Sequence, residues 1–181
     1  MSIVTVANIK ALGRIDTDAH DALLAILLES AEAYIEEECQ IKLSTGTIEE
    51  RVDGGYEQLW PRYLPVNSVT SVKDTFNDDE EIESTEYYNT VTQIIAEENG
   101  YWEEGRNRWK INYSYGYSDA TAPVGLKLPL MQLVIRYYNN IEGMADQSAG
   151  TGGDYRTTWA KLMDTDILES LSKFSLKRVV E

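Results

Sequence analysis

The sequence predicts an α+β fold, in which a helical core of a long N-terminal helix plus C-terminal helices is interrupted by a small antiparallel β module. Apolar residues recur at helical spacing towards both ends of the chain, whereas they alternate with polar residues in the middle third. We therefore expect an N-terminal helical part of the core at residues 1–44, the β module at 45–120, and C-terminal helices with a tail at 121–181.

The first helix is expected from about Thr17 to Glu38, with Asp16 and Asp18 as further N-cap candidates. At 100° per residue its apolar residues share one face. They are Leu23, Leu24, Leu27, Leu28, Ala31, Tyr34 and Ile35. The opposite face is acidic and carries Asp18, Asp21, Glu29, Glu32 and Glu36. That face is either a solvated surface, or one that faces a polyanion or pairs with a basic partner.

The middle third alternates in the way that half-buried strands do. Trp109, Ile111, Tyr113 and Tyr115 alternate with polar residues over 108–115. The β-branched residues of 66–73 and 91–97 predict two more strands. The turn residues Asp53-Gly54-Gly55 predict a hairpin that returns through 56–60.

The C-terminal third returns to helical spacing. Pro123 suits a helix start, and Pro129 is then expected to kink that helix. One apolar stripe holds Leu126, Leu130, Leu133, Val134, Tyr137 and Ile141. A second stripe holds Leu128, Met131, Ile135 and Tyr138, and it faces either the β module or another subunit. A last helix is expected at about 166–173.

Composition excludes several classes of chemistry. The formal charge of −15 opposes non-specific binding to nucleic acid and to anionic membranes. With Cys39 and His20 as the one cysteine and the one histidine, a Cys/His zinc cage is excluded. We predict no catalytic, metal or cofactor site, no membrane partner, and no signal peptide or membrane span. A glycoside hydrolase that uses a pair of carboxylates stays open as an alternative. The chain has so many acidic residues that no particular pair is indicated.

The order of short motifs is more informative than any one of them. Leu59-Trp60-Pro61 precedes the run Pro65-Val66-Asn67-Ser68-Val69-Thr70-Ser71-Val72, and Glu86-Tyr87-Tyr88 follows. Tyr113-Ser114-Tyr115-Gly116-Tyr117 then leads to Pro123-Val124-Gly125-Leu126-Lys127 and to Tyr137-Tyr138-Asn139-Asn140. Over residues 5–142 this order resembles the head-tail connector proteins of tailed bacteriophages, which are also called adaptor or head-completion proteins.

The resemblance implies a non-enzymatic virion protein at the head–tail interface, assembled in the host cytoplasm. It implies a homo-oligomeric ring, typically of twelve subunits, beneath the portal protein, with a stopper or tail-completion protein on the far side. It also implies that the C-terminal segment contacts the portal. The candidate contacts are Leu168, Leu171, Phe174, Leu176, Lys177 and Arg178.

The charge pattern is consistent with such a ring. DNA must slide through it without specific binding, and acidic side chains repel phosphate. The acidic face of the first helix is therefore a candidate lining of the lumen, and the second apolar stripe of the 126–141 helix is a candidate subunit interface. The alternative that remains open is a soluble protein-binding module unrelated to virions, which predicts a monomer with a preformed pocket.

Overall fold

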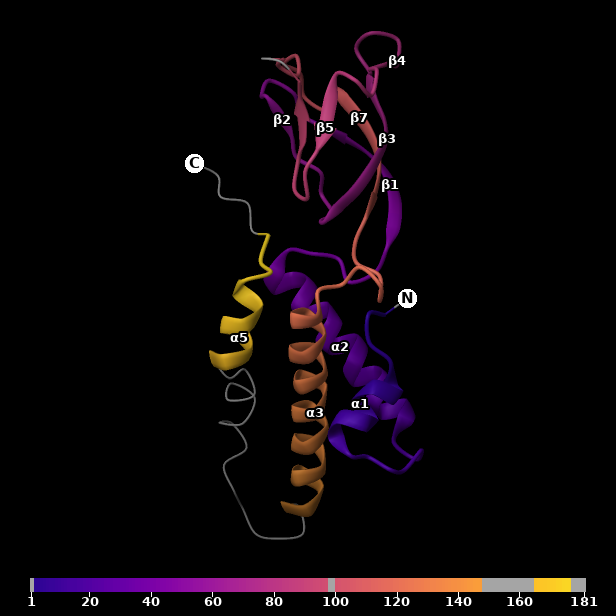
Figure 1. The fold of residues 1–181 in the computed structure, drawn as a ribbon, viewed down its shortest axis with the longest axis vertical. Coiled ribbons are helices and arrows are strands. Elements are labelled where there is room, and N and C mark those ends of the chain that lie inside the picture. The colour runs from indigo at the N-terminus through magenta and orange to yellow at the C-terminus, as the bar shows by residue number, and fades with distance from the viewer. Residues whose placement is uncertain (1, 98–99, 148–164, 177–181) are drawn as a thin grey trace. The chain divides into compact units, whose positions relative to one another are not determined.

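The structure, a computed structural model, describes residues 2–97, 100–147 and 165–176 (Figure 1). Its contacts divide the described chain into two compact units. The first, Gln40–Ser118, is called the β unit here. The second joins Ser2–Cys39 to the described residues of 119–176 and is called the helical unit. The helical unit is thus built from both ends of the chain.

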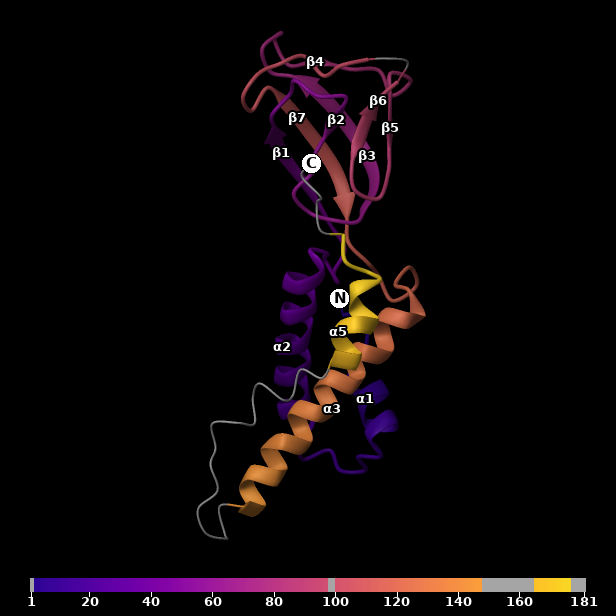
Figure 2. The same cartoon turned by 90° about the vertical axis from the view of Figure 1, so that its left-hand side faces the viewer.

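The helical unit contains α1 (Val6–Gly13), α2 (Asp21–Cys39), α3 (Val124–Gln147) and α5 (Thr165–Ser172). Helix α3 packs against α1, α2 and α5, and Figures 1 and 2 both show α5 beside the N-terminal half of α3. The core residues come from the predicted apolar faces. They include Leu24, Leu27, Leu28, Ala31, Ile35, Leu126, Leu130, Leu133 and Val134. None of the helices in the described ranges is long and apolar enough to cross a membrane.

The N-terminal helices differ from the sequence prediction. Helix α1 was not expected, although Thr5 and Asn8 form a capping box in which each side chain bonds the other residue's backbone N–H. The predicted start of the next helix at Thr17 is wrong, because the helix begins at Asp21. The Thr17 hydroxyl instead accepts a hydrogen bond from the Ala19 N–H, which holds a turn ahead of α2.

Helix α3 begins one residue after Pro123 and continues through Pro129 to Gln147. The predicted start is confirmed. Pro129 lies within the second turn and is buried. Proline at that place removes one backbone hydrogen bond without ending the helix.

The β unit holds two antiparallel sheets. A four-stranded sheet has the order β1 (Gly46–Val52), β7 (Trp109–Tyr115), β3 (Val66–Asp74), β4 (Glu80–Glu81). A three-stranded sheet has the order β2 (Gln58–Leu59), β6 (Ile94–Ala96), β5 (Tyr87–Asn89). The predicted alternation of β7 is confirmed, since Trp109, Ile111 and Tyr113 are buried.

The predicted hairpin at residues 53–55 is wrong. Strand β1 pairs with β7, while β2 lies in the other sheet and pairs with β6. Instead of turning back, the chain runs beside residues 102–105: the Gly54 N–H donates to the Gly105 carbonyl and the Gly55 N–H to the Trp102 carbonyl. A Cβ on Gly54 would lie 2.0 Å from the Glu103 carbonyl oxygen. The glycines therefore serve close approach of two segments.

Aromatic rings connect the two sheets of the β unit. Trp102 lies between Tyr87 of β5 and Trp109 of β7, with ring centroids 6.1 and 4.9 Å away. Tyr113 of β7 is fully buried, and its hydroxyl accepts from the Tyr63 N–H and donates to Glu50. Burial raises the pKa of Tyr113 well above its usual value.

The predicted α+β class with antiparallel strands is confirmed, and the description as a helical core holds in part. Strands make up a large share of the molecule, and the β unit has a core of its own. Its buried residues include Leu59, Val66, Val72, Ile94, Trp102, Trp109, Ile111 and Tyr113.

Candidate functional sites

Two of the five candidate lumen residues share one lysine as their ion-pair partner. Lys10 of α1 places its Nζ 2.5 Å from an Asp18 carboxylate oxygen and 2.8 Å from one of Asp21. The hydrogen bond that Lys10 donates to Asp18 lowers the pKa of Asp18 and raises the pKa of Lys10. These two carboxylates hold the start of α2 against α1 and present less negative charge than the sequence suggests.

The other three acidic residues lie along α2 with graded exposure. Glu29 is exposed, and Glu32 and Glu36 are partly covered. The Ser2 hydroxyl donates to Glu32, and burial raises the pKa of that carboxyl. The exposed face of α2 also carries an apolar side chain, because Ile26 is 61% exposed one turn before Ser30.

The four candidate interface residues of α3 differ in exposure. Leu128 is 45% exposed, whereas Met131 and Ile135 are half-buried. Tyr138 is buried, and its hydroxyl lies 2.5 Å from Nδ1 of His20. Tyr138 thus belongs to the packing of the helical unit, and Leu128 is the member of this set most available to a neighbour.

Sequence reasoning missed one apolar position on α3. Val124 is 81% exposed and lies four residues before Leu128, so the two side chains share one face of the helix. Val124 is the first residue of the helix and lies outside the predicted stripe, so helical periodicity did not indicate that it belongs to this face. Exposed apolar side chains that adjoin in this way are typical of contact surfaces.

The candidate portal contacts lie on α5 and in the residues that follow it. Leu171 is buried, and its carbonyl accepts a hydrogen bond from the Cys39 thiol at 3.6 Å. The Leu176 N–H donates to the Cys39 carbonyl, and Phe174 packs against Gly125, where an added Cβ would lie 2.9 Å from the ring. Phe174 and Leu176 remain half-exposed. The Leu168 side chain, Lys177 and Arg178 lie outside the described residues.

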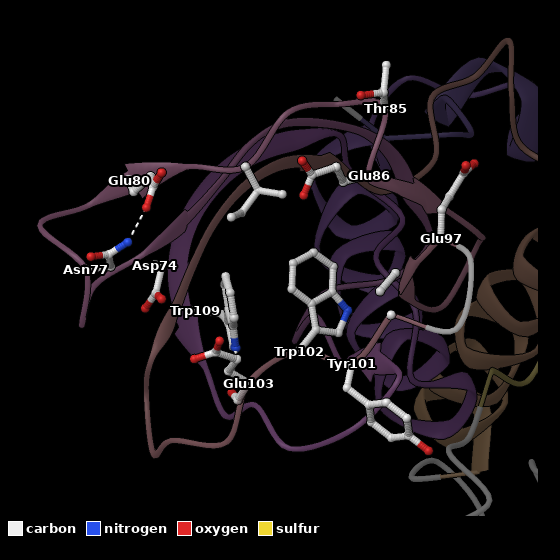
Figure 3. Close-up of a pocket in the computed structure, with 13 residues that line it drawn as sticks. Asp74, Asn77, Glu80, Thr85, Glu86, Glu97, Tyr101, Trp102, Glu103 and Trp109 are labelled. Carbon is white, nitrogen blue, oxygen red and sulfur yellow. Dashed lines mark hydrogen bonds between the residues drawn. The ribbon is translucent and has the colours of Figure 1, made fainter.

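The β unit carries a pocket of about 470 Å³ beside its indole pair (Figure 3). Carboxylates and aromatic rings dominate its lining. These are Asp74, Glu80, Glu86, Glu97 and Glu103, with Tyr101, Trp102 and Trp109. Sequence reasoning did not find this pocket, because its lining residues become neighbours only when β3, β5 and the 100–103 segment come together.

An ion pair forms one end of this pocket. Arg108 binds Asp74 through two hydrogen bonds, of 2.8 Å from Nε and 2.5 Å from a terminal nitrogen, and also lies 2.5 Å from Glu103. The hydrogen bonds from Arg108 lower the pKa of Asp74. The Arg108 guanidinium lies 5.5 Å from the centre of the Trp109 ring.

The chemistry of these sites favours protein contacts. Within the described ranges, no group of three or more His, Cys, Asp or Glu residues is placed to hold a metal ion. Exposed apolar positions on helices and a polar pocket on a small β unit define an α+β protein whose surfaces suit the binding of other proteins.

This chain belongs to the head completion protein family, whose family model matches residues 2–168. The resemblance found from the sequence is thereby confirmed. No curated protein matches the chain.

Solved structures of gene transfer agent (GTA) particles share the fold. A chain from the neck of an empty GTA particle, computed with C6 symmetry, is 18% identical with a TM-score of 0.64, over 98% of this chain and 92% of that one. A chain from the virion of a native GTA particle is 17% identical with a TM-score of 0.65, over the same shares. A chain from the neck of a native GTA particle, computed with C12 symmetry, is 18% identical with a TM-score of 0.60, over 99% and 94%.

Proposed function

We propose that this chain is a structural head–tail connector of a tailed bacteriophage and has no enzymatic activity. Its membership of the head completion family, over residues 2–168, is the observation that carries the proposal. Fold similarity over nearly the whole chain to components of GTA necks and virions supports a place at the head–tail interface.

In this proposal the chain forms a homo-oligomeric ring, of twelve subunits, beneath the portal protein. A stopper or tail-completion protein binds the opposite side of the ring. The C12 symmetry of the GTA neck that contains a similar chain supports the subunit number. Head-to-tail contacts of identical subunits close into such a ring when their rotation permits.

The subunit contact is proposed to use the second stripe of α3, with Leu128 at its exposed end. Met131 and Ile135 extend that surface, and Tyr138 supports it from within the helical unit. Portal contact is proposed for the segment from Leu168 to Arg178. Within it, Phe174 and Leu176 offer half-exposed apolar surface, while Leu171 holds α5 in place.

DNA is proposed to pass through the ring without being bound. Of the acidic residues of the first two helices, Glu29 is exposed and Glu36 is partly so, and both suit a lumen lining. Asp18 and Asp21 contribute less because Lys10 offsets their charge. Glu29→Lys should therefore slow DNA ejection from assembled particles, while Asp18→Lys should mainly disturb the α1–α2 contact.

The experiment that tests the connector role is removal of this gene from the phage. We expect DNA-filled heads and free tails to accumulate, and infectious particles to return when the chain is supplied from a plasmid. The ring is tested by cryo-electron microscopy of portal complexes purified with and without the chain. Normal tailed, infectious particles in the absence of this chain would refute the proposal.

A further inference from the structure

We propose that the pocket of the β unit is a docking site for an arginine side chain presented by a partner protein. Figure 3 shows the pocket, in which Trp102 stands among Glu86, Glu97 and Tyr101. The inference stands on this pocket and does not depend on the connector role. The occupant is a guanidinium on an extended chain.

At one end of the pocket, an arginine of the chain itself is held by two carboxylates beside an indole ring. The other end has carboxylates and an indole but no arginine among the described residues that line it. Arg108 is held between Asp74 and Glu103, with its guanidinium 5.5 Å from the centre of the Trp109 ring. At the other end, Glu86 stands by Trp102 and Glu97 lines the edge of the pocket with its carboxylate turned outward (Figure 3), and neither makes an ion pair with a described residue. Two carboxylates beside an aromatic floor are a suitable receptor for one guanidinium, through charge-assisted hydrogen bonds and stacking.

The Trp102 indole gives an independent reason to expect an occupant. Trp102 is 3% exposed, and its Nε1–H has no acceptor among the described residues. The neighbouring indole, Trp109, donates to the Glu103 carbonyl at 3.0 Å. In Figure 3 the nitrogen of Trp102 turns towards the Glu97 side of the pocket. A buried donor without an acceptor costs free energy, and a backbone carbonyl of an incoming chain would supply the acceptor.

Charge and exposure decide which occupant fits. Negative charge around the opening repels phosphate, so a nucleic acid does not suit the site. No three carboxylates in the described ranges are placed as metal ligands. Tyr101, 67% exposed at the rim, adds a ring on which a planar guanidinium can stack. An arginine from a protein partner satisfies the carboxylates and the ring, and a carbonyl next to it in the partner chain would serve the indole N–H once the Trp102 ring shifts towards the pocket.

The test follows the indole N–H signals of the full chain by NMR, with the other tryptophans as internal references. The probe is the peptide acetyl-Gly-Arg-Gly-amide, and the control peptide carries citrulline, the neutral isostere of arginine. We expect the Trp102 indole proton to shift downfield and saturate, with a dissociation constant on the order of 1 mM. The citrulline peptide should leave it unmoved.

Matched variants make the test specific to the pocket. The double variant Glu86→Gln with Glu97→Gln should lower the affinity for the arginine peptide by about fivefold or more. Glu83→Gln removes an exposed carboxylate that does not line the pocket, and should leave the affinity unchanged. Equal affinity of the double variant and the wild type would overturn the proposal.

Three further results would also overturn it. The first is a Trp102 signal that does not respond to the arginine peptide. The second is an equal response to magnesium or calcium ions alone, which would make the pocket a cation site. The third is a shift that depends on protein concentration without peptide, which would assign the pocket to a second copy of the chain.

Discussion

The helical unit and the β unit bury different kinds of side chain. The core of the helical unit is almost entirely aliphatic, with Leu24, Ile35 and Leu130 among its fully buried members. The β unit buries aromatic rings, and Asp74 within it is the one charged residue among those described as buried. Aliphatic packing is non-directional, whereas an ion pair between fixed strands requires one geometry.

Each of the two units is therefore held together by a different kind of contact. In the β unit, Arg108 joins β3 to β7 through Asp74 and fixes the place of Trp109. Rigid elements of that kind position a recognition site better than flexible ones.

The largest expected effect compares two leucines of α3. Leu130 is fully buried and Leu128 is 45% exposed, two residues apart on the same helix. Leu130→Ala should lower the free energy of unfolding by about 2–5 kcal/mol, because it leaves a cavity. Leu128→Ala should cost no more than about 0.5 kcal/mol, since its side chain is partly in water.

Chemical denaturation followed by two probes would sharpen this comparison. Circular dichroism at the helical band reports mainly on the helical unit, and tryptophan fluorescence reports strongly on Trp60, Trp102 and Trp109 of the β unit. If the two units unfold independently, Leu130→Ala should shift the transition seen by circular dichroism more than the one seen by tryptophan fluorescence. Coincident shifts would mean that the two units unfold together.

The second prediction breaks the ion pair of the β unit. Asp74→Asn should cost about 2 kcal/mol, because it leaves Arg108 without its main buried partner. The matched control is Glu81→Gln, which removes the exposed pair that Lys73 makes at 3.3 Å and should cost less than about 0.5 kcal/mol. Both are measured by urea denaturation at neutral pH.

The pH dependence of the Asp74 variant has a defined sign. Arg108 holds the pKa of Asp74 below its ordinary value of 3.8, so the folded state binds this proton less readily than the unfolded state does. The stabilisation is present above that value and is lost as pH falls through the lower folded pKa. The gap between wild type and Asp74→Asn should therefore close in acid. A gap that stays constant down to the lowest pH at which the protein folds would contradict this assignment.

The sequence predicted the elements better than their pairing. Period-2 alternation found β7, and the apolar faces found α2 and α3, because each signal is local to one element. The hairpin at Asp53 failed because Gly54 is required by close approach to residue 103, a contact that no local pattern encodes. The short strand β5 was missed since three residues are too few to show alternation.

The candidate sites divide in the same way. Exposure at Glu29 and Leu128 follows from helical periodicity and could be anticipated. The pairing of Lys10 with Asp18 and Asp21 depends on α1, which the sequence analysis had not assigned. The acidic pocket depends on tertiary neighbours from three segments, so no local pattern in the sequence brings its carboxylates together.

The third prediction concerns the N-cap of α1, which tests whether this short helix is held by its cap or by packing. Thr5→Ala removes the hydroxyl that accepts from the Asn8 N–H and should cost about 1 kcal/mol. Thr5→Ser keeps the acceptor and should stay near the wild-type stability. Thermal unfolding of the three proteins measures this. A cost in Thr5→Ser equal to that in Thr5→Ala would show that the methyl group matters and the cap does not.

The smallest expected effect is a gain at Glu32 of α2. Burial raises the pKa of this carboxyl above its ordinary value of 4.5, so the folded state holds the proton more readily than the unfolded state does. Stability from this group is therefore highest below the unfolded pKa and is lost as pH rises through the folded pKa. Glu32→Gln removes the charge and keeps an oxygen for the Ser2 hydroxyl. At pH 7 it should stabilise the chain by up to about 0.5 kcal/mol.

Glu29→Gln is the matched control, since Glu29 is exposed one turn earlier on the same helix. It should leave stability at pH 7 unchanged, because its side chain is exposed to water. The advantage of Glu32→Gln should disappear below about pH 4, where the wild-type carboxyl is protonated in both states. If Glu32→Gln instead destabilised the chain at pH 7, the hydrogen bond from Ser2 to the charged carboxylate would outweigh the cost of burying it. The helical unit would then depend, as the β unit does, on a polar contact.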